Sequence, residues 1–322
     1  MEKVPQAGFR IEGLDIAGFN RSSLIKNIGL PFKLLKSFLQ VRRIFKSFKP
    51  DAAIGVGGYS SFPVLRYAQQ QGVKTFLHES NSFAGKSNIM LGRKATRIFV
   101  AKPGMEKFFP ADRIQVTGNP VRRTIEDGVT TREDAIRFFH LDPAKTTVLS
   151  VGGSLGAKSI NEALRKDLAM FGNAGMQLIW QTGKPFEAEG KHAAEGKANV
   201  WCGPFITQME QAYAAADIVI SRAGAMAIAE LCITGKPAVL VPFPHAAEDH
   251  QTHNARQLAD KGAGIMVTDA EAAGKLVAQV IDLSRNEERR RTLSENIRKL
   301  AIGRADEVIA GSILAELEKE KV

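Results

Sequence analysis

One stretch near the middle of the chain, residues 147–161, constrains the fold more than any other. It reads TVLSVGGSLGAKSIN, an apolar β-prone run that ends in glycines and continues into a helical pattern. Glycines let the backbone turn sharply, and the N–H groups that open the next helix can then point at a phosphate. The stretch favours a nucleotide-type ligand, although a tight strand–helix connection without a ligand has the same pattern. It is not a full dinucleotide fingerprint, because no acidic residue follows about 20 positions later.

The composition indicates a protein that buries a large core without crossing a membrane. The chain has 322 residues, 44% of them hydrophobic, a length typical of two domains. Its longest apolar stretch, residues 225–243, is interrupted by Glu230, Lys236 and two prolines, which excludes a membrane span. Cys202 and Cys232 lie in apolar contexts that suit buried thiols. No secretory signal pattern opens the sequence, so we expect a cytoplasmic location.

The charge balance points to anionic partners. Lys and Arg number 44 against 34 Asp and Glu, a net charge of +10, which favours nucleic acid, phosphates or acidic lipid. The basic run at residues 285–291 is typical of a solvated helix face, so we predict no nucleic-acid partner.

Residues 30–49 predict a helix with two apolar faces. The first is an ordinary core stripe, made of Leu34, Phe38, Val41, Ile44, Phe45 and Phe48. The second lies opposite and consists of Phe32, Leu35 and Leu39, interleaved with Lys36, Arg42, Arg43, Lys46 and Lys49. Apolar residues ringed by cations are what a helix lying on an anionic membrane requires. A solvated basic face with ordinary exposed leucines is the alternative.

Strands alternate with helices along the whole chain. The first half predicts strands at residues 51–56, 73–77, 97–101 and 114–117, after an extended segment at 9–16. The second half predicts strands at 147–151, 176–181, 200–205, 218–221, 238–243 and 264–267, with helices at 159–171, 207–215, 223–234 and 251–261. This alternation indicates an α/β protein with two tandem Rossmann-like, doubly wound domains. We predict domains at 1–124 and 125–302, with a C-terminal helix, 303–322, packing back on the first.

Four strand ends of the second half are expected to meet at one cleft, because ligands of such sheets bind beyond the carboxyl ends of the strands. They are residues 152–154, 205–206, 221–225 and 242–254. Glu230 lies about two turns, roughly 9 to 10 Å, into one helix, a suitable place for a carboxylate that accepts both ribose hydroxyls. A partly buried acid with a local partner is the alternative. The polar run at 248–254 suits the hydroxyls of a sugar, and Asp249 also suits a helix N-cap.

Several absences narrow the chemistry. The sequence contains no Asp-x-Asp pair, which disfavours a metal-bridged diphosphate, and its histidines and cysteines lack metal-ligand spacing, so we predict no metal. Neither a nucleophile elbow nor a Cys/His pairing indicates a covalent nucleophile. The charge of a leaving group then has to be stabilised by helix N-termini and cations.

Six ordered motifs resemble those of the MurG family, peptidoglycan N-acetylglucosaminyltransferases of the GT-B fold. They are Gly57-Gly58-Tyr59, His78-Glu79-Ser80-Asn81 with Ala84-Gly85, Gly118-Asn119-Pro120-Val121-Arg122, Gly152-Gly153-Ser154-Leu155-Gly156-Ala157, Ser221-Arg222-Ala223-Gly224-Ala225 with Glu230, and Pro242-Phe243-Pro244 with His250, Gln251 and Asn254. The resemblance covers essentially the whole chain. It implies inverting transfer of N-acetylglucosamine (GlcNAc) from UDP-GlcNAc to the undecaprenyl-linked acceptor lipid I, which gives lipid II and UDP.

The resemblance also implies roles for individual residues. The backbone of Ile206 would read uracil, and Ser154 and Arg122 would lie at the phosphates. Ribose and diphosphate would be held by the run Ala225, Met226, Ala227, Ile228, Ala229 and Glu230. Gln251, with Asn254 nearby, would bind the GlcNAc, and Asn81 would reach it from the first domain. No cofactor is implied, since UDP-GlcNAc is a substrate.

The acceptor side is expected in the first domain. Its candidate residues for the acceptor or the membrane are Tyr59, His78, Glu79, Phe32, Leu35, Leu39, Lys36 and Arg43. The resemblance favours the hypothesis that the helix at 30–49 lies on an anionic membrane. It implies a peripheral protein on the cytoplasmic face of the bacterial inner membrane, seated on its anionic surface.

The chain departs from the family pattern at its beginning. The family opens with a strand and a Gly-Gly-Thr-Gly-Gly-His loop, whose His is the usual candidate base, and this sequence starts after that point. We therefore assign no catalytic residue, expect the base upstream of Met1, and expect the chain to be inactive as written. A non-catalytic UDP-sugar-binding, membrane-associated protein is one alternative. A sugar-nucleotide 2-epimerase of the same fold is another, although the basic-apolar helix and the His-Glu-Ser-Asn motif argue against it.

Overall fold

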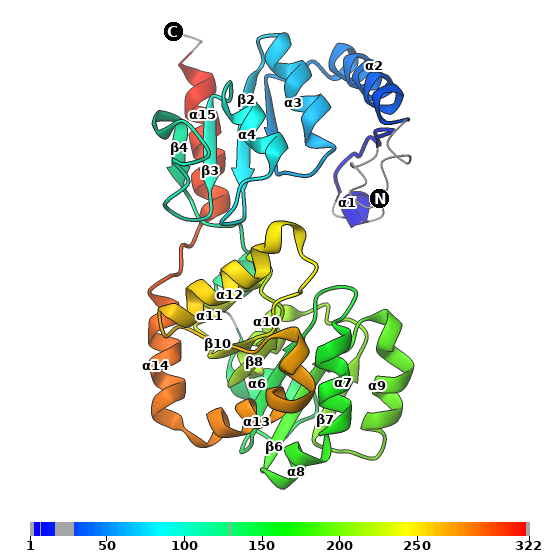
Figure 1. The fold of residues 1–322 in the computed structure, drawn as a ribbon, viewed down its shortest axis with the longest axis vertical. Coiled ribbons are helices and arrows are strands. Elements are labelled where there is room, and N and C mark those ends of the chain that lie inside the picture. Colours follow the sequence, from blue (N-terminus) through cyan, green and yellow to red (C-terminus); the bar gives the residue numbers. More distant parts are fainter. Residues whose placement is uncertain (1–2, 7, 17–28, 129, 320–322) are drawn as a thin grey trace. The chain divides into compact units, whose positions relative to one another are not determined.

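The protein divides into two compact units. The structure is a computed structural model that describes residues 3–6, 8–16, 29–128 and 130–319. One unit comprises Met1–Thr117 and Glu307–Val322, and the other comprises Gly118–Asp306 (Figure 1).

The first unit contains a parallel sheet of four strands in the order β1-β2-β3-β4. The strands are β1 (Ala52–Gly55), β2 (Lys74–Glu79), β3 (Arg97–Val100) and β4 (Ile114–Val116). The helices are α1 (Lys3–Gln6), α2 (Leu30–Phe48), α3 (Ser61–Gln70), α4 (Lys86–Gly92) and most of α15 (Ala305–Glu318), with a 3-10 turn at Ala111–Arg113. Because side chains alternate along a strand, Leu77 and Ile98 pack with α3 and α4 on one face, while Phe76 and Phe99 pack with Ile309 of α15 on the other.

α15 returns the end of the chain to this first sheet (Figure 1). Besides Ile309, its Glu316 accepts a hydrogen bond from Arg97 Nε at 3.0 Å, and Ser312 Oγ donates to Gln115 Oε1 at 3.0 Å. One helix therefore has its apolar partners on β2 and β3, and these polar partners on β3 and β4.

The second unit contains a parallel sheet of six strands in the order β10-β9-β8-β5-β6-β7. The strands are β5 (Thr146–Val151), β6 (Met176–Gln181), β7 (Val200–Gly203), β8 (Ile218–Ser221), β9 (Ala238–Leu240) and β10 (Ile265–Met266). The order reverses at β5, which lies between β6 and β8, so the sheet is doubly wound with its switch point at the central stretch. The predicted fold class is confirmed.

Helices cover both faces of this second sheet. They are α5 (Arg123–Glu126), α6 (Arg132–Phe138), α7 (Lys158–Lys166), α8 (Ala169–Asn173), α9 (Glu187–Ala194), α10 (Met209–Ala215), α11 (Ala225–Thr234), α12 (His250–Asp260), α13 (Ala272–Arg285) and α14 (Glu287–Arg298), with 3-10 turns at Lys184–Phe186, Ala247–Asp249 and Asp269–Glu271. The core divides accordingly: α7, α8 and α13 pack on one face, and α6, α10, α11 and α12 pack on the other.

The structure differs from the sequence-based expectations at several boundaries. The single helix predicted at 159–171 is two helices, α7 and α8, and α9 was not predicted. The extended segment at 9–16 forms no strand. The units divide before Gly118, ahead of the predicted boundary after residue 124. The reason is that Val121 packs into the core of the second unit and Asn119 Nδ2 donates to Ala225 O at 3.3 Å.

Across the described ranges, no helix combines the length and the apolar character that a bilayer crossing needs.

Candidate functional site

A cavity of about 760 Å³ opens at the carboxyl ends of the strands in the second unit. Its volume is within the range typical of small-ligand sites. It brings together six residues that the sequence assigned to a ligand: Arg122, Ser154, Ile206, Ala227, Glu230 and Gln251. We call this cavity the donor pocket.

The glycine loop between β5 and α7 forms one wall of the donor pocket. Gly156 has φ +76°, and a Cβ there would lie 2.0 Å from Thr182 O. At Gly152 a Cβ would lie 2.4 Å from the backbone N of Ala157. Only glycine allows these two close approaches, and they bring the start of α7 to the pocket wall. The start of α11, after Gly224, reaches the same pocket, so two helix N-termini with their partial positive charge are available to an anion.

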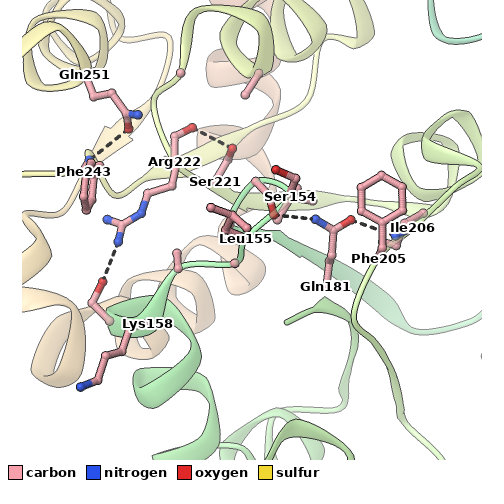
Figure 2. A pocket seen from close by; sticks show the side chains of 18 of the residues that line it. Ser154, Leu155, Lys158, Gln181, Phe205, Ile206, Ser221, Arg222, Phe243 and Gln251 are labelled. Atoms are coloured by element: carbon pink, nitrogen blue, oxygen red, sulfur yellow. Dashed lines mark hydrogen bonds between the residues drawn. The ribbon is translucent and has the colours of Figure 1, made fainter. Parts of the chain in front are cut away.

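Gln181, at the end of β6, connects two walls of the pocket (Figure 2). Its Nε2 donates to Gly153 O at 3.0 Å, and its Oε1 accepts from the N–H of Ile206 at 2.9 Å. The side chain is 2% exposed, so both hydrogen bonds are shielded from water. The N–H of Ile206 is therefore already engaged.

Arg222, directly after β8, lines the pocket (Figure 2) and joins three further segments around it. Its guanidinium donates to Asp269 Oδ1, to Ser159 Oγ at 3.2 Å, and to the carbonyls of Val241 and Pro242 at 3.1 and 3.2 Å. Ser159 Oγ donates to the same carboxylate oxygen. The start of α7, the loop after β9 and the turn at Asp269–Glu271 are thus held by one planar cation.

The loop that follows β9 leads into α12, whose second residue, Gln251, lines the pocket. Gln251 Oε1 accepts from the N–H of Phe243 at 3.0 Å, and the Arg222 guanidinium lies 5.4 Å from the Phe243 ring centroid. Glu248 and Asp249 have φ of 56° and 52°, a left-handed backbone that side chains rarely adopt. Within the described chain Asp249 makes no capping hydrogen bond, so the alternative that it caps α12 is wrong: its left-handed backbone is not the extended one of an N-cap.

Glu230 is the one acidic side chain of α11, and it faces the pocket. Its Oε2 accepts from the Tyr213 hydroxyl at 2.9 Å, and its Oε1 lies 3.8 Å from Arg122 Nη2. Burial raises the pKa of Glu230, while the Tyr213 hydrogen bond and the Arg122 cation lower it. The carboxylate is therefore partly buried with a local partner, as the alternative predicted, and it also lines the pocket.

Other residues of the predicted donor set do not line this pocket. Ala225, Met226, Ile228, Ala229 and Asn254 lie outside its lining. Ile228 and Ala229 pack against the core, and Asn254 is 5% exposed and donates from Nδ2 to Ala223 O at 3.2 Å. Asn254 thus supports the loop before α11.

The predicted residues of the first unit form a separate polar cluster. Glu79, buried at the end of β2, accepts from the N–H groups of Asn81 and Gly85 at 3.1 and 3.2 Å, and from Asn88 Nδ2 at 2.8 Å. His78 is also buried, with Nδ1 3.3 Å from Ser80 Oγ. His78 and Glu79 therefore shape this loop from beneath, whereas Tyr59 is exposed.

The second apolar face of α2 is exposed. Phe32, Leu35 and Leu39 are 76%, 63% and 59% exposed, and Arg43 is exposed beside them. Lys36 forms an ion pair with Asp15. We call Phe32, Leu35 and Leu39 with Lys36 and Arg43 the α2 surface. Of the predicted core stripe, Val41 is buried, and Phe48 is exposed because it ends the helix.

The comparisons with known proteins agree on one family. A model of the glycosyltransferase family 28 N-terminal domain matches residues 1–100, and one of its C-terminal domain matches residues 147–308. A protein of Parabacteroides distasonis, 47% identical over 99% of this chain and 88% of its own length, is named UDP-N-acetylglucosamine--N-acetylmuramyl-(pentapeptide) pyrophosphoryl-undecaprenol N-acetylglucosamine transferase. A protein of Bacteroides thetaiotaomicron with the same name is 48% identical over 99% of this chain and 87% of its length. The chain belongs to the MurG family.

Solved structures agree with this family. MurG of Acinetobacter baumannii superposes with a TM-score of 0.77 at 30% identity, over 97% of this chain and 87% of that one. A UDP-GlcNAc 2-epimerase of Neisseria meningitidis superposes with a TM-score of 0.61 at 13% identity, over 92% of this chain and 84% of that one, a likeness of fold alone. The matches support neither the alternative functions nor the expected inactivity.

Sequence reasoning missed the side chains that hold the donor pocket together. Gln181 and Tyr213 were not singled out, and Arg222 was quoted only as part of a motif. Gln181 could have been found as the last residue of a predicted strand. Tyr213 offered no such signal, since it lies inside a helix.

Proposed function

We propose that this chain transfers GlcNAc from UDP-GlcNAc to lipid I and releases lipid II and UDP. The observation that carries the proposal is the presence of Glu230 in the same pocket as the starts of α7 and α11. A carboxylate that accepts from ribose, next to two helix N-termini that stabilise a diphosphate, matches the parts of a nucleoside-diphosphate sugar. In the reaction the bond between C1 of GlcNAc and the phosphate oxygen breaks. A bond from C1 to the muramoyl 4-oxygen forms with inversion, and the hydroxyl proton leaves to a base.

The residues of the donor pocket support distinct roles in binding. Ile206 would read uracil through its carbonyl, because its N–H already donates to Gln181. A carbonyl accepts from N3–H of uracil but has no donor to meet at N3 of cytosine. Ser154 and Arg122 would meet the phosphates, and Gln251 the sugar, all three from the pocket lining. The N-termini of α7 and α11 would stabilise the charge on departing UDP.

The acceptor is proposed to bind through the first unit. The loop that Glu79 organises presents Asn81, and the exposed Tyr59 follows β1. The α2 surface supports peripheral binding to an anionic membrane, since its apolar side chains can enter the interface while Lys36 and Arg43 meet lipid headgroups. We place the protein on the cytoplasmic face of the inner membrane, where a nucleotide-sugar donor and a lipid-linked acceptor would meet.

The test is a transfer assay with purified protein, radiolabelled UDP-GlcNAc and a lipid I analogue. We expect label in the lipid fraction in amounts equal to the UDP released, and none when the acceptor is omitted. UDP-GlcNAc binding without transfer would indicate the non-catalytic alternative. Conversion of the donor sugar to its 2-epimer without acceptor would indicate the epimerase.

A further inference from the structure

Tyr213 is a buried hydroxyl that none of the roles above uses. It lies on α10, is 3% exposed, and packs in the core cluster that contains Ala212, Ala216 and Leu231. Its ring reaches the lining of the donor pocket, and its hydroxyl donates to Glu230 Oε2 at 2.9 Å. A phenol fixed by its core packing therefore meets the acidic side chain expected to bind the donor.

We propose that Tyr213 is a positioning residue that makes Glu230 a receptor for a ribose diol and so selects ribonucleotide over deoxyribonucleotide donors. The inference rests on the proposed function, because it assigns the ribose to Glu230. Tyr213 acts through Glu230 and need not touch the donor.

The geometry leaves enough lone-pair sites of the Glu230 carboxylate unoccupied to accept both hydroxyls of a ribose. A carboxylate offers about four lone-pair sites. Tyr213 occupies one of them on Oε2, and Arg122 Nη2, at 3.8 Å from Oε1, is beyond hydrogen-bonding distance. About three sites remain, enough for the two hydroxyls of a ribose and open on the side that lines the pocket. A 2′-deoxyribose can fill only one of the two positions.

Recognition of a ribose diol depends on the protonation states of Tyr213 and Glu230, which burial and their shared hydrogen bond influence. Burial raises the pKa of Tyr213 well above its ordinary value, so the phenol stays a donor. Burial also raises the pKa of Glu230, and the Tyr213 hydrogen bond is the largest contribution that lowers it again. An ionised Glu230 can only accept, so the ligand must supply donors such as the hydroxyl groups of a ribose.

The test measures the dissociation constants of UDP and 2′-deoxy-UDP by calorimetry for the wild type, Tyr213→Phe, Glu230→Gln and the double variant. Loss of a hydrogen bond to a charged group predicts about tenfold weaker UDP binding by Tyr213→Phe. Binding of 2′-deoxy-UDP should change less, so the preference for ribose falls. In a chain that already carries Glu230→Gln, Tyr213→Phe should weaken UDP binding little further. The double-mutant cycle isolates the interaction between these two side chains.

Two outcomes would overturn the inference and leave the proposed function intact. One is equal weakening of UDP and 2′-deoxy-UDP by Tyr213→Phe, which would indicate general damage to the fold. The other is additive effects in the double variant. A wild-type chain that fails to bind UDP at all would overturn the proposed function as well. Tyr67→Phe is the matched control, since Tyr67 packs edge-on against Phe45 in the first unit, and it should leave both constants unchanged.

Discussion

The donor pocket and the α2 surface are built in opposite ways. In the donor pocket, buried polar side chains hold one another: Gln181 spans two walls, and Arg222 contacts four groups from three segments. On the α2 surface the large side chains are apolar and mostly exposed, and Lys36 with Asp15 forms an exposed ion pair.

This difference teaches what kind of ligand each region can recognise. Fixed donors and acceptors suit a small ligand of defined shape, because little has to be ordered when it binds. An exposed apolar face with cations suits a fluid partner such as a lipid surface, for which no single geometry exists. Changes in one region should therefore leave the function of the other intact.

The largest expected effect comes from removing the apolar part of the α2 surface. Replacing Phe32, Leu35 and Leu39 together by Ser should lower partitioning onto anionic vesicles by on the order of 1,000-fold, at about 1.5 kcal/mol for each side chain withdrawn from the interface. Vesicle sedimentation measures the loss, and calorimetry should find UDP binding unchanged. Vesicle binding by the variant equal to that of the wild type would contradict the proposed membrane-binding role of α2. Val308→Ser on α15, also partly exposed, is a control away from the α2 surface.

The next effect concerns Glu230 in the donor pocket. Glu230→Gln keeps the shape but presents one NH₂ donor where the carboxylate accepts, so kcat/KM for UDP-GlcNAc should fall by about 100-fold. Vesicle binding should not change, whereas the α2 variant is expected to lose vesicle binding and to keep UDP binding. Glu162→Gln is the matched control, because Glu162 also lines the pocket and its partner among the described residues is Lys158, in an exposed ion pair. A similar loss in both variants would argue against a specific role for Glu230.

Local pattern was enough to predict the sheets and the glycine loop. The central strands of the second unit are mostly apolar runs buried on both faces, so their positions follow from the chain itself, as at Met176–Gln181. Gly152 and Gly156 likewise sit where a side chain would collide with nearby backbone. Helix boundaries were less predictable: α7 ends at Lys166 and α8 begins three residues later, although the apolar pattern runs through both.

The contacts that complete the donor pocket could not be predicted from the sequence. Gln181 bonds to Gly153, which lies 28 positions away, and Arg222 bonds to Ser159 and Asp269, which lie 63 and 47 positions away. Such pairs depend on how strands are ordered in the sheet, which a local pattern does not encode. The α2 surface was predictable for the opposite reason, since its residues share one helix and follow its period.

A smaller effect is expected from Arg222, because its hydrogen bonds hold together three segments of the pocket wall. Its side chain is 12% exposed, and Arg222→Met leaves Asp269 with Ser159 but without its cation. We expect a loss of about 2 to 3 kcal/mol in the free energy of unfolding, and donor affinity about tenfold lower. Both tryptophans, Trp180 and Trp201, lie in the second unit, so their fluorescence in urea reports its unfolding. Arg291→Met, on the exposed side of α14, should change neither quantity, and an equally stable Arg222→Met would refute the supporting role.

The smallest effect is a shift in pH dependence, and it tests whether the donor pocket depends on the charge of Glu230. Burial raises the pKa of this carboxyl, and the groups that oppose the rise are Tyr213 on α10 and Arg122 before α5. Only the ionised form accepts from both ribose hydroxyls, so kcat/KM for the donor should fall as pH decreases through the raised pKa and stay level above it. Tyr213→Phe removes one lowering contribution and should move this fall to higher pH. At any one pH the shift should add less than about a tenfold difference to the weaker binding that is independent of pH. The vesicle binding of the same variant should follow the wild-type profile, because Tyr213 lies in the second unit and the α2 surface belongs to the first. An unshifted profile for Tyr213→Phe would mean that the pocket recognises the donor without using the ionisation of Glu230.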